Sequence, residues 1–309
     1  MWDKPRLLQR NEGGGDVSGG GAVSVERAPP GIALALGGGV ARGWAHIGVL
    51  RALDEAGVRI GMIAGTSIGA LVGGCYLAGK LDELESFARS ITRRRMFGFF
   101  DVRFNGDGLI GGMKLDARLR EHLAGVRFED LERPFVCVAT ELDTGHEIWI
   151  SQGALIPAMR ASYALPGVFT PVRCNRRTLI DGAMVNPVPV SVCRAHEQRL
   201  VIAVNLHYDH FGRAAVLRHD AGDCVPASPD GPDGKRLGVA GVMIEAFNIV
   251  QDRILRSRLA GDPPDMAITP RLADIGLSEF HRADEAIRIG YETTLARMED
   301  IRRMQAVLA

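Results

Sequence analysis

Three short motifs in this chain combine residue types that could carry out nucleophilic catalysis. The first is Gly65-Thr66-Ser67-Ile68-Gly69, hereafter the elbow, in which a serine lies between two glycines. An apolar run over residues 59–64 precedes it and small residues follow, which predicts a buried strand, a tight turn and a helix. Such a turn pushes the Ser67 hydroxyl outward, while Gly65 and Gly69 let strand and helix approach closely. Ser67 is the candidate nucleophile; a helix N-cap is the alternative interpretation of this serine.

The second motif is a glycine-rich loop, residues 37–43, that follows an apolar run over residues 32–36. The consecutive backbone amides of Gly37, Gly38 and Gly39 can donate hydrogen bonds to the oxyanion of an acyl tetrahedral intermediate. Glycine suits these positions because side chains would keep the scissile carbonyl away. Arg42 would add positive charge beside the loop, useful for the oxyanion or for an anionic head group.

The third motif is Asp181-Gly182, which follows a short apolar strand over residues 178–180. In a partly desolvated site, the Asp181 carboxylate can accept the proton of a serine hydroxyl directly. Taken alone, Asp-Gly is a common turn sequence. The aspartate gains its significance from the glycine loop and the elbow that precede it in the chain.

Alternating predicted strands and helices place these motifs in an α/β fold. A strand over 32–36, a helix over about 45–53 and the strand before the elbow form a βαβ unit, for which right-handed parallel geometry is expected. Both loops then lie at the carboxyl ends of parallel strands, where open α/β sheets bind ligands. Further strands are predicted at 135–140, 147–150, 178–180 and 200–205, and further helices at 81–90, 115–123, 154–163, 239–260 and 281–308.

The three motifs together resemble the patatin-like phospholipase family, in its short bacterial form, over residues 31–206. The resemblance implies a three-layer α/β/α sandwich with a mainly parallel central sheet. It also implies a serine lipid acyl hydrolase with a Ser67-Asp181 dyad, an oxyanion hole in the glycine loop and no metal or organic cofactor. The expected substrate is a carboxylic ester of a phospholipid, lysophospholipid or similar acyl lipid.

Other interpretations of these residues stay open at this point. The spacing of Gly37, Gly39 and Gly43 approximates the glycine fingerprint of a dinucleotide-binding site. Two features argue against such a site: no Gly-Lys-Ser/Thr ends the loop, and the second strand leads into the elbow, where a dinucleotide site would carry an acidic residue that binds the ribose. A Ser-Asp-His esterase is an alternative, and its candidate histidines are His207, His210 and His281. A catalytically idle or regulatory lipid-binding protein of the same fold is another. His46 is expected to pack or hydrogen-bond within the first helix, and Arg160 and Ser162 to give structural support.

Composition limits the partners and the location. The 37 basic and 37 acidic residues balance, so no net field attracts nucleic acid. The five cysteines are widely spaced with no Cys-x-x-Cys pair, which argues against a disulfide framework or a zinc site. Neither a signal peptide nor a transmembrane run is evident, so we expect a cytoplasmic protein that can at most lie peripherally on a membrane.

One segment, residues 93–100, combines basic and aromatic side chains. This basic-aromatic segment could touch anionic lipid, or it could be a helix end with arginines on the terminal carbonyls and phenylalanines packed inside. Its relevant residues are Arg93, Arg94, Arg95, Phe97, Phe99 and Phe100.

The predicted domain organisation is a flexible tail over residues 1–30 followed by one hydrolase domain over 31–309. The tail is rich in glycine and polar residues that cannot bury enough apolar surface to order the chain. A mobile insertion is expected at about 208–237, where Asp, Gly, Pro and Ser crowd together.

Overall fold

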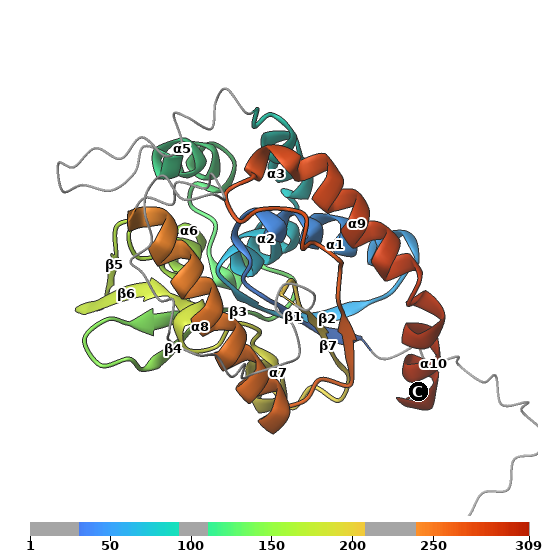
Figure 1. The fold of residues 1–309 in the computed structure, drawn as a ribbon. Coiled ribbons are helices and arrows are strands. Elements are labelled where there is room, and N and C mark those ends of the chain that lie inside the picture. The colour runs from blue at the N-terminus through green and yellow to red at the C-terminus, as the bar shows by residue number, and fades with distance from the viewer. Residues whose placement is uncertain (1–30, 93–110, 208–238, 309) are drawn as a thin grey trace, which may run out of the picture.

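A mixed sheet of eight strands forms the centre of the fold, and helices flank it on both sides (Figure 1). The computed structural model describes residues 31–92, 111–207 and 239–308. The strands are β1 (Ile32–Leu36), β2 (Ile60–Thr66), β3 (Phe135–Glu141), β4 (Glu147–Ile150), β5 (Val172–Cys174), β6 (Arg177–Asp181), β7 (Val201–Val204) and β8 (Met266–Ile268).

Helices connect most successive strands, whereas β4 directly follows β3 and β6 directly follows β5. The α-helices are α1 (Ala45–Glu55), α2 (Ile68–Leu77), α3 (Leu81–Arg89), α5 (Gly111–Leu123), α6 (Leu155–Ser162), α7 (Val190–Ala195), α8 (Val239–Gly261), α9 (Ala283–Leu295) and α10 (Met298–Leu308). Short 3₁₀ turns are η1 (Val40–Trp44), η2 (Phe128–Asp130), η3 (Gly182–Met184) and η4 (Phe280–Arg282). The predicted helix over 281–308 is therefore two helices, α9 and α10, separated at residues 296–297.

The strand order is β5-β6-β3-β2-β1-β7-β8, with β4 paired to β3. Parallel pairs join β3 to β2, β2 to β1, β1 to β7 and β7 to β8. The pairs β3–β4, β3–β6 and β5–β6 are antiparallel. The sheet is thus parallel in its central part, as predicted, and antiparallel at the end that carries β6.

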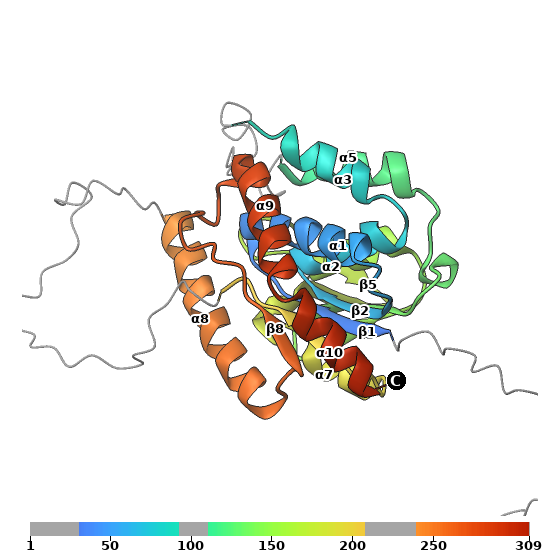
Figure 2. The ribbon, with the colours of Figure 1, turned by 90° about the vertical axis from the view of Figure 1, so that its right-hand side faces the viewer.

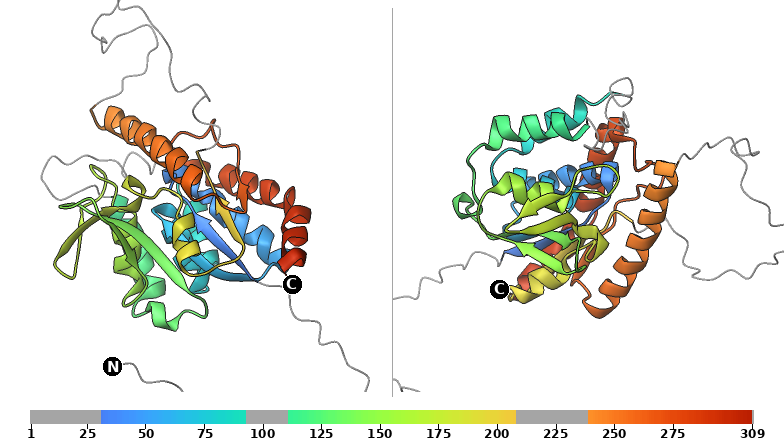
Figure 3. Two further views of the ribbon diagram at one scale, coloured as in Figure 1. Left: turned by 90° about the horizontal axis from the view of Figure 1, so that it is seen from below. Right: turned by 90° about the vertical axis from the view of Figure 1, so that its left-hand side faces the viewer.

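The two faces of β1 differ in side-chain size and pack against different helices. Ile32, Leu34 and Leu36 of β1 pack in one hydrophobic cluster with α1, α2 and α9, whereas Ala33 and Ala35 face the cluster that includes α7 and Leu255 of α8. The views in Figures 2 and 3 show α3 and α5 beyond α1 and α2, with α8 on the opposite side of the sheet. This arrangement is the three-layer α/β/α sandwich expected from the sequence.

The predicted tail over 1–30, the basic-aromatic segment at 93–100 and the insertion at 208–237 lie outside the described residues. In the part of the chain that the structure describes, no helix is long and apolar enough to cross a bilayer.

Candidate active site

The elbow has the conformation that its sequence predicts. β2 ends at Thr66, Ser67 adopts a left-handed φ of 55°, and α2 begins at the next residue. A Cβ added to Gly69 would lie 2.2 Å from the Leu36 carbonyl oxygen of β1, and one added to Gly65 would lie 2.6 Å from the backbone of Ala70. Both contacts are shorter than carbon atoms tolerate, so glycine at these positions is what lets α2 begin directly against the sheet.

The pairing of β3 brings Asp181 to the elbow. Along one edge of β3, the last residue of β2, Thr66, pairs with Val138. Asp181, at the end of β6, pairs with Ala139, which is the next residue of β3. β4 also pairs with Val138 and Ala139, along the opposite edge of β3. β6 therefore pairs along the same edge of β3 as β2, just beyond the point where the pairing with β2 ends. The turn that carries Ser67 therefore begins next to the end of the strand that carries Asp181.

A direct hydrogen bond joins the two side chains. Ser67 Oγ donates to Asp181 Oδ2 at 2.6 Å, and the Ala183 backbone N–H donates to Asp181 Oδ1 at 2.9 Å. Ser67 is 7% exposed and Asp181 1%. Burial raises the pKa of Asp181 to about 7, and the hydrogen bonds from Ser67 and Ala183 partly oppose this rise. The carboxyl group can thus gain or lose a proton near neutral pH.

Buried hydroxyl groups hold the backbone on both sides of this hydrogen bond. Ser162 Oγ accepts the backbone N–H of Ser67 at 2.9 Å, and Thr140 Oγ1 donates to the backbone carbonyl of Asp181 at 2.9 Å. Thr66 Oγ1 donates to the carbonyl of Asn186 at 2.8 Å, which ties the strand before the elbow to the loop after η3. From the sequence only a structural role is expected for Ser162, because nothing in its local pattern points to the elbow.

The glycine loop lies beside Ser67. A Cβ added to Gly38 would be 3.5 Å from the Cβ of Ser67. The N–H of Gly37 donates to Val204 O at 3.2 Å and that of Gly38 to Pro187 O at 2.9 Å. Within the described part of the chain, the N–H of Gly39 has no hydrogen-bond partner. Of the three amides predicted to bind an oxyanion, that of Gly39 can therefore donate without breaking an existing bond.

Arg42 and His46 both contact the backbone of this region. The buried Arg42 side chain donates from Nε to the carbonyl of Ile275 at 2.8 Å, which ties the loop to the segment before η4. His46 Nε2 lies 2.7 Å from the carbonyl oxygen of Gly37, so the imidazole donates from Nε2. Burial lowers the pKa of His46 to about 4, and the ring is neutral at physiological pH.

The histidines of the alternative triad do not stand between Ser67 and Asp181, because the hydroxyl contacts the carboxylate directly. His207 is buried, and its backbone N–H donates to Asn205 Oδ1. His281 lies in η4, and His210 lies outside the described residues. Across residues 31–92, 111–207 and 239–308, no group of three or more His, Cys, Asp or Glu side chains is arranged to hold a metal ion.

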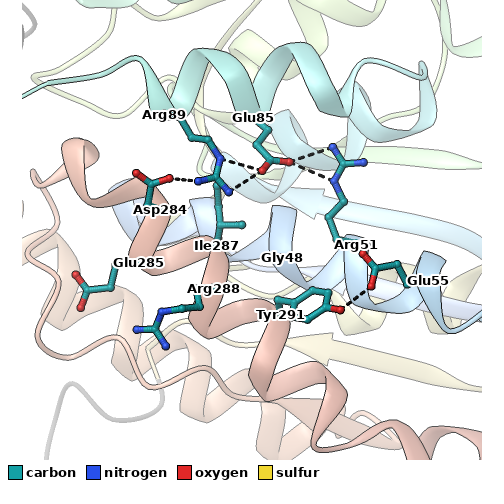
Figure 4. Close-up of a pocket in the computed structure, with 10 residues that line it drawn as sticks. All are labelled: Gly48, Arg51, Glu55, Glu85, Arg89, Asp284, Glu285, Ile287, Arg288 and Tyr291. Atoms are coloured by element: carbon teal, nitrogen blue, oxygen red, sulfur yellow. Dashed lines mark hydrogen bonds and ion pairs between the residues drawn. The ribbon is translucent and has the colours of Figure 1, made fainter.

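A groove of about 720 Å³ lies elsewhere, between α1, α3 and α9 (Figure 4). Four of the charged groups that line it pair with one another: Glu85 accepts hydrogen bonds from Arg51 and Arg89, and Arg89 also bonds to Asp284. Tyr291 donates to Glu55 at 2.5 Å. These pairs hold three helices together, and the groove lacks the nucleophile and base found at the elbow.

A sequence model of the patatin-like phospholipase family matches residues 34–194. An uncharacterised NTE family protein of Mycobacterium bovis is 32% identical over 321 residues, covering 84% of this chain and 89% of that protein. A protein of Caenorhabditis elegans named for a patatin-like phospholipase domain is 27% identical, covering 87% of this chain and 26% of its own length. Lysophospholipase NTE1 of Mycosarcoma maydis is 34% identical over 180 residues, 57% of this chain and 10% of that protein.

Proposed function

This chain belongs to the patatin-like phospholipase family, and from that membership we propose that it is a serine lipid acyl hydrolase in which Ser67 is the nucleophile and Asp181 the base. The family supports hydrolysis of lipids in general. The observation that carries the finer assignment is the 2.6 Å hydrogen bond from Ser67 Oγ to Asp181 Oδ2 in a buried site. A general base must lie within hydrogen-bond reach of the proton that it removes.

In the first half of the proposed reaction, the Ser67 hydroxyl proton moves to Asp181 Oδ2 while Oγ attacks the carbonyl carbon of the lipid ester. The carbonyl oxygen becomes an oxyanion. Collapse of this intermediate breaks the bond to the alcohol oxygen, which takes the proton from Asp181 and leaves. The acyl group stays on Ser67.

In the second half, Asp181 accepts a proton from water, whose oxygen attacks the acyl carbon. Collapse of the second oxyanion breaks the bond to Oγ and releases the fatty acid. Ser67 Oγ regains the proton from Asp181. A pKa of about 7 suits this carboxyl group to both proton transfers near neutral pH.

The glycine loop is the proposed oxyanion hole. Gly39 supplies an N–H that is free among the described residues, and Gly37 and Gly38 shape the loop through their bonds to Val204 and Pro187. The absence of a side chain on Gly38 leaves space for the acyl carbon beside Ser67. Arg42 acts on the loop by fixing it to Ile275. No metal or organic cofactor takes part in the proposed steps.

The proposed substrates are phospholipids, lysophospholipids and similar acyl lipids. The similarity to a protein named lysophospholipase adds weight to a lysophospholipid. Peripheral membrane contact through residues 93–100 also stays a proposal, and replacing Phe97, Phe99 and Phe100 together is expected to weaken binding to anionic liposomes in a sedimentation assay. Unchanged binding would contradict a membrane contact through these phenylalanines.

Covalent labelling by a fluorophosphonate tests the nucleophile. We expect one adduct, located on Ser67 by peptide mass spectrometry, and none on the Ser67→Ala variant. Hydrolysis of a panel of esters that differ in head group and chain length identifies the substrate. Folded protein that binds lipid vesicles, takes up no label and hydrolyses no ester would instead be the catalytically idle lipid-binding protein.

A further inference from the structure

The hydrogen-bond ladder between β2 and β3 predicts a partner for the backbone N–H of Ser67. Ile63 N–H donates to the carbonyl of Pro134 at 3.1 Å, and the parallel register aligns Ile63 with Phe135 and Thr66 with Val138. In a parallel ladder, the backbone of every second residue forms hydrogen bonds to the same neighbouring strand. Continuing this alternation from Ile63 brings the N–H of Ser67 opposite the carbonyl of Val138.

The side chain of Ser162 occupies that position in the ladder. Its Oγ accepts the N–H of Ser67 at 2.9 Å and donates to the carbonyl of Val138 at 2.6 Å. Ser162 is the last residue of α6 and is 0% exposed. One hydroxyl group from a helix thus satisfies the two backbone groups that would otherwise bond to each other.

We propose that Ser162 is a positioning residue for the nucleophile, whose hydroxyl separates β2 from β3 at the elbow and holds Ser67 in the conformation that faces Asp181. This inference rests on the proposed function, because it concerns the same nucleophile. Ser162 touches neither the substrate nor the reacting Oγ in this role. It acts through the backbone of Ser67.

The conformation of Ser67 explains why such a support is needed. Its φ of 55° and ψ of −124° lie outside the regions that residues with a side chain prefer. Residues persist there only when the surrounding structure determines their conformation. Loss of the Ser162 hydroxyl leaves two outcomes. The N–H of Ser67 could bond directly to Val138 O and draw the residue back toward the strand, or both groups could remain buried without a partner.

The hydrogen bond from the Ser67 N–H to Ser162 also limits which backbone groups can form the oxyanion hole. Because the N–H of Ser67 donates to Ser162, this amide is not available to the oxyanion of an acyl intermediate. The donors must then come from other backbone groups, which agrees with the proposed role of the glycine loop and the free N–H of Gly39.

The test compares Ser162→Ala and Ser162→Cys with the full-length wild-type protein. Alanine removes the hydroxyl, and cysteine keeps a similar shape but is a weak hydrogen-bond donor and acceptor. For both variants we expect kcat to fall about 10- to 100-fold, because a displacement of about 1 Å in a reacting group costs about this much in rate. We expect KM to stay within about twofold of wild type, and the rate of fluorophosphonate labelling at Ser67 to fall in parallel with kcat.

Thr294→Val is the matched control. Thr294 is also 0% exposed, and its Oγ1 donates to the carbonyl of Gly290 at 2.8 Å within α9. This variant removes a buried hydroxyl group that lies away from the elbow. Its melting temperature is therefore expected to fall, while kcat and the labelling rate stay at wild-type values. If Ser162→Ala does not fold, Ser162→Cys is the variant whose rates decide the question.

Wild-type rates of labelling and turnover in a folded Ser162 variant would overturn the positioning role and leave the proposed nucleophile intact. A rise in KM with unchanged kcat would also overturn it, because a displaced nucleophile impairs the chemical step. Failure of wild-type protein to label at Ser67 would overturn the proposed function itself. The two failures are therefore distinguishable.

Discussion

Replacing Asp181 with asparagine is expected to remove most of the activity and, at alkaline pH, to make the protein more stable. Asparagine has nearly the same shape, so its oxygen can accept the N–H of Ala183, and its amide group can face Ser67 Oγ. It cannot take the proton of Ser67. Loss of a general base lowers turnover by roughly 10²- to 10⁴-fold, and wild-type activity should rise with pH through the Asp181 pKa of about 7.

The effect on stability follows from the pKa of the buried carboxyl group. Burial raises this pKa from 3.8 to about 7 in the folded protein. Between these values, the folded state holds a proton that the unfolded chain has lost, so the free energy of unfolding falls as the pH rises. About three pH units at about 1.4 kcal/mol each give a loss of about 4 kcal/mol, complete above pH 7. The Asp181→Asn variant does not undergo this loss.

Urea denaturation at pH 4.5 and at pH 8, followed by circular dichroism, measures this difference. Other ionisable groups affect both proteins alike and cancel when the variant is compared with wild type. We expect the variant to gain about 2 to 4 kcal/mol relative to wild type between the two pH values. The Ser67→Ala variant provides a cross-check: it removes a hydrogen bond that stabilises the carboxylate, so the pKa of Asp181 rises and the loss of stability extends to higher pH. A stability difference between Asp181→Asn and wild type that is the same at both pH values would refute the reasoning.

Two further predictions concern the residues around the dyad. His46→Gln should lower kcat about tenfold by disturbing the bond to the Gly37 carbonyl. Because the pKa of His46 is about 4, the rise in activity through the Asp181 pKa of about 7 should remain in the variant, and its disappearance there would contradict this role. Gly69→Ala should destabilise the fold by roughly 3 kcal/mol or prevent folding, because its Cβ would lie 2.2 Å from the carbonyl oxygen of Leu36. Gly261→Ala, where a Cβ meets nothing within 4 Å, is the control, and equal melting temperatures for the two variants would show that the elbow tolerates a side chain.

The local parts of the site could be predicted from the sequence because their determinants are local. An apolar run that breaks into Gly65-Thr66-Ser67-Ile68-Gly69 specifies a strand, a turn and a helix within a few residues. The fold class followed from alternating strand and helix patterns, together with the family resemblance that the motifs carry. The sequence could not reveal the break between α9 and α10, because the apolar pattern continues across residues 296–297 without glycine or proline.

Hydrogen-bond partners distant in the chain could not be predicted in this way. Ser162 is 95 residues from Ser67, and its hydroxyl reaches the elbow only because α6 packs against β3 and α2. Likewise, the sequence does not distinguish the backbone N–H groups of Gly37, Gly38 and Gly39 as hydrogen-bond donors to an oxyanion. Their different partners emerge only when β7 and the loop before α7 are placed beside them.

The sequence alone determined that Ser67 lies on a turn between a strand and a helix, with a glycine loop one βα unit earlier and Asp181 at the end of a later strand. Tertiary structure decided that these residues meet. Ser67 and Asp181 are 114 positions apart, and they come within 2.6 Å because β6 pairs with β3 on the edge that β2 leaves at the elbow. Burial at that junction also sets the proton affinity of the carboxyl group, since desolvation depends on all the chain segments that exclude water from Asp181.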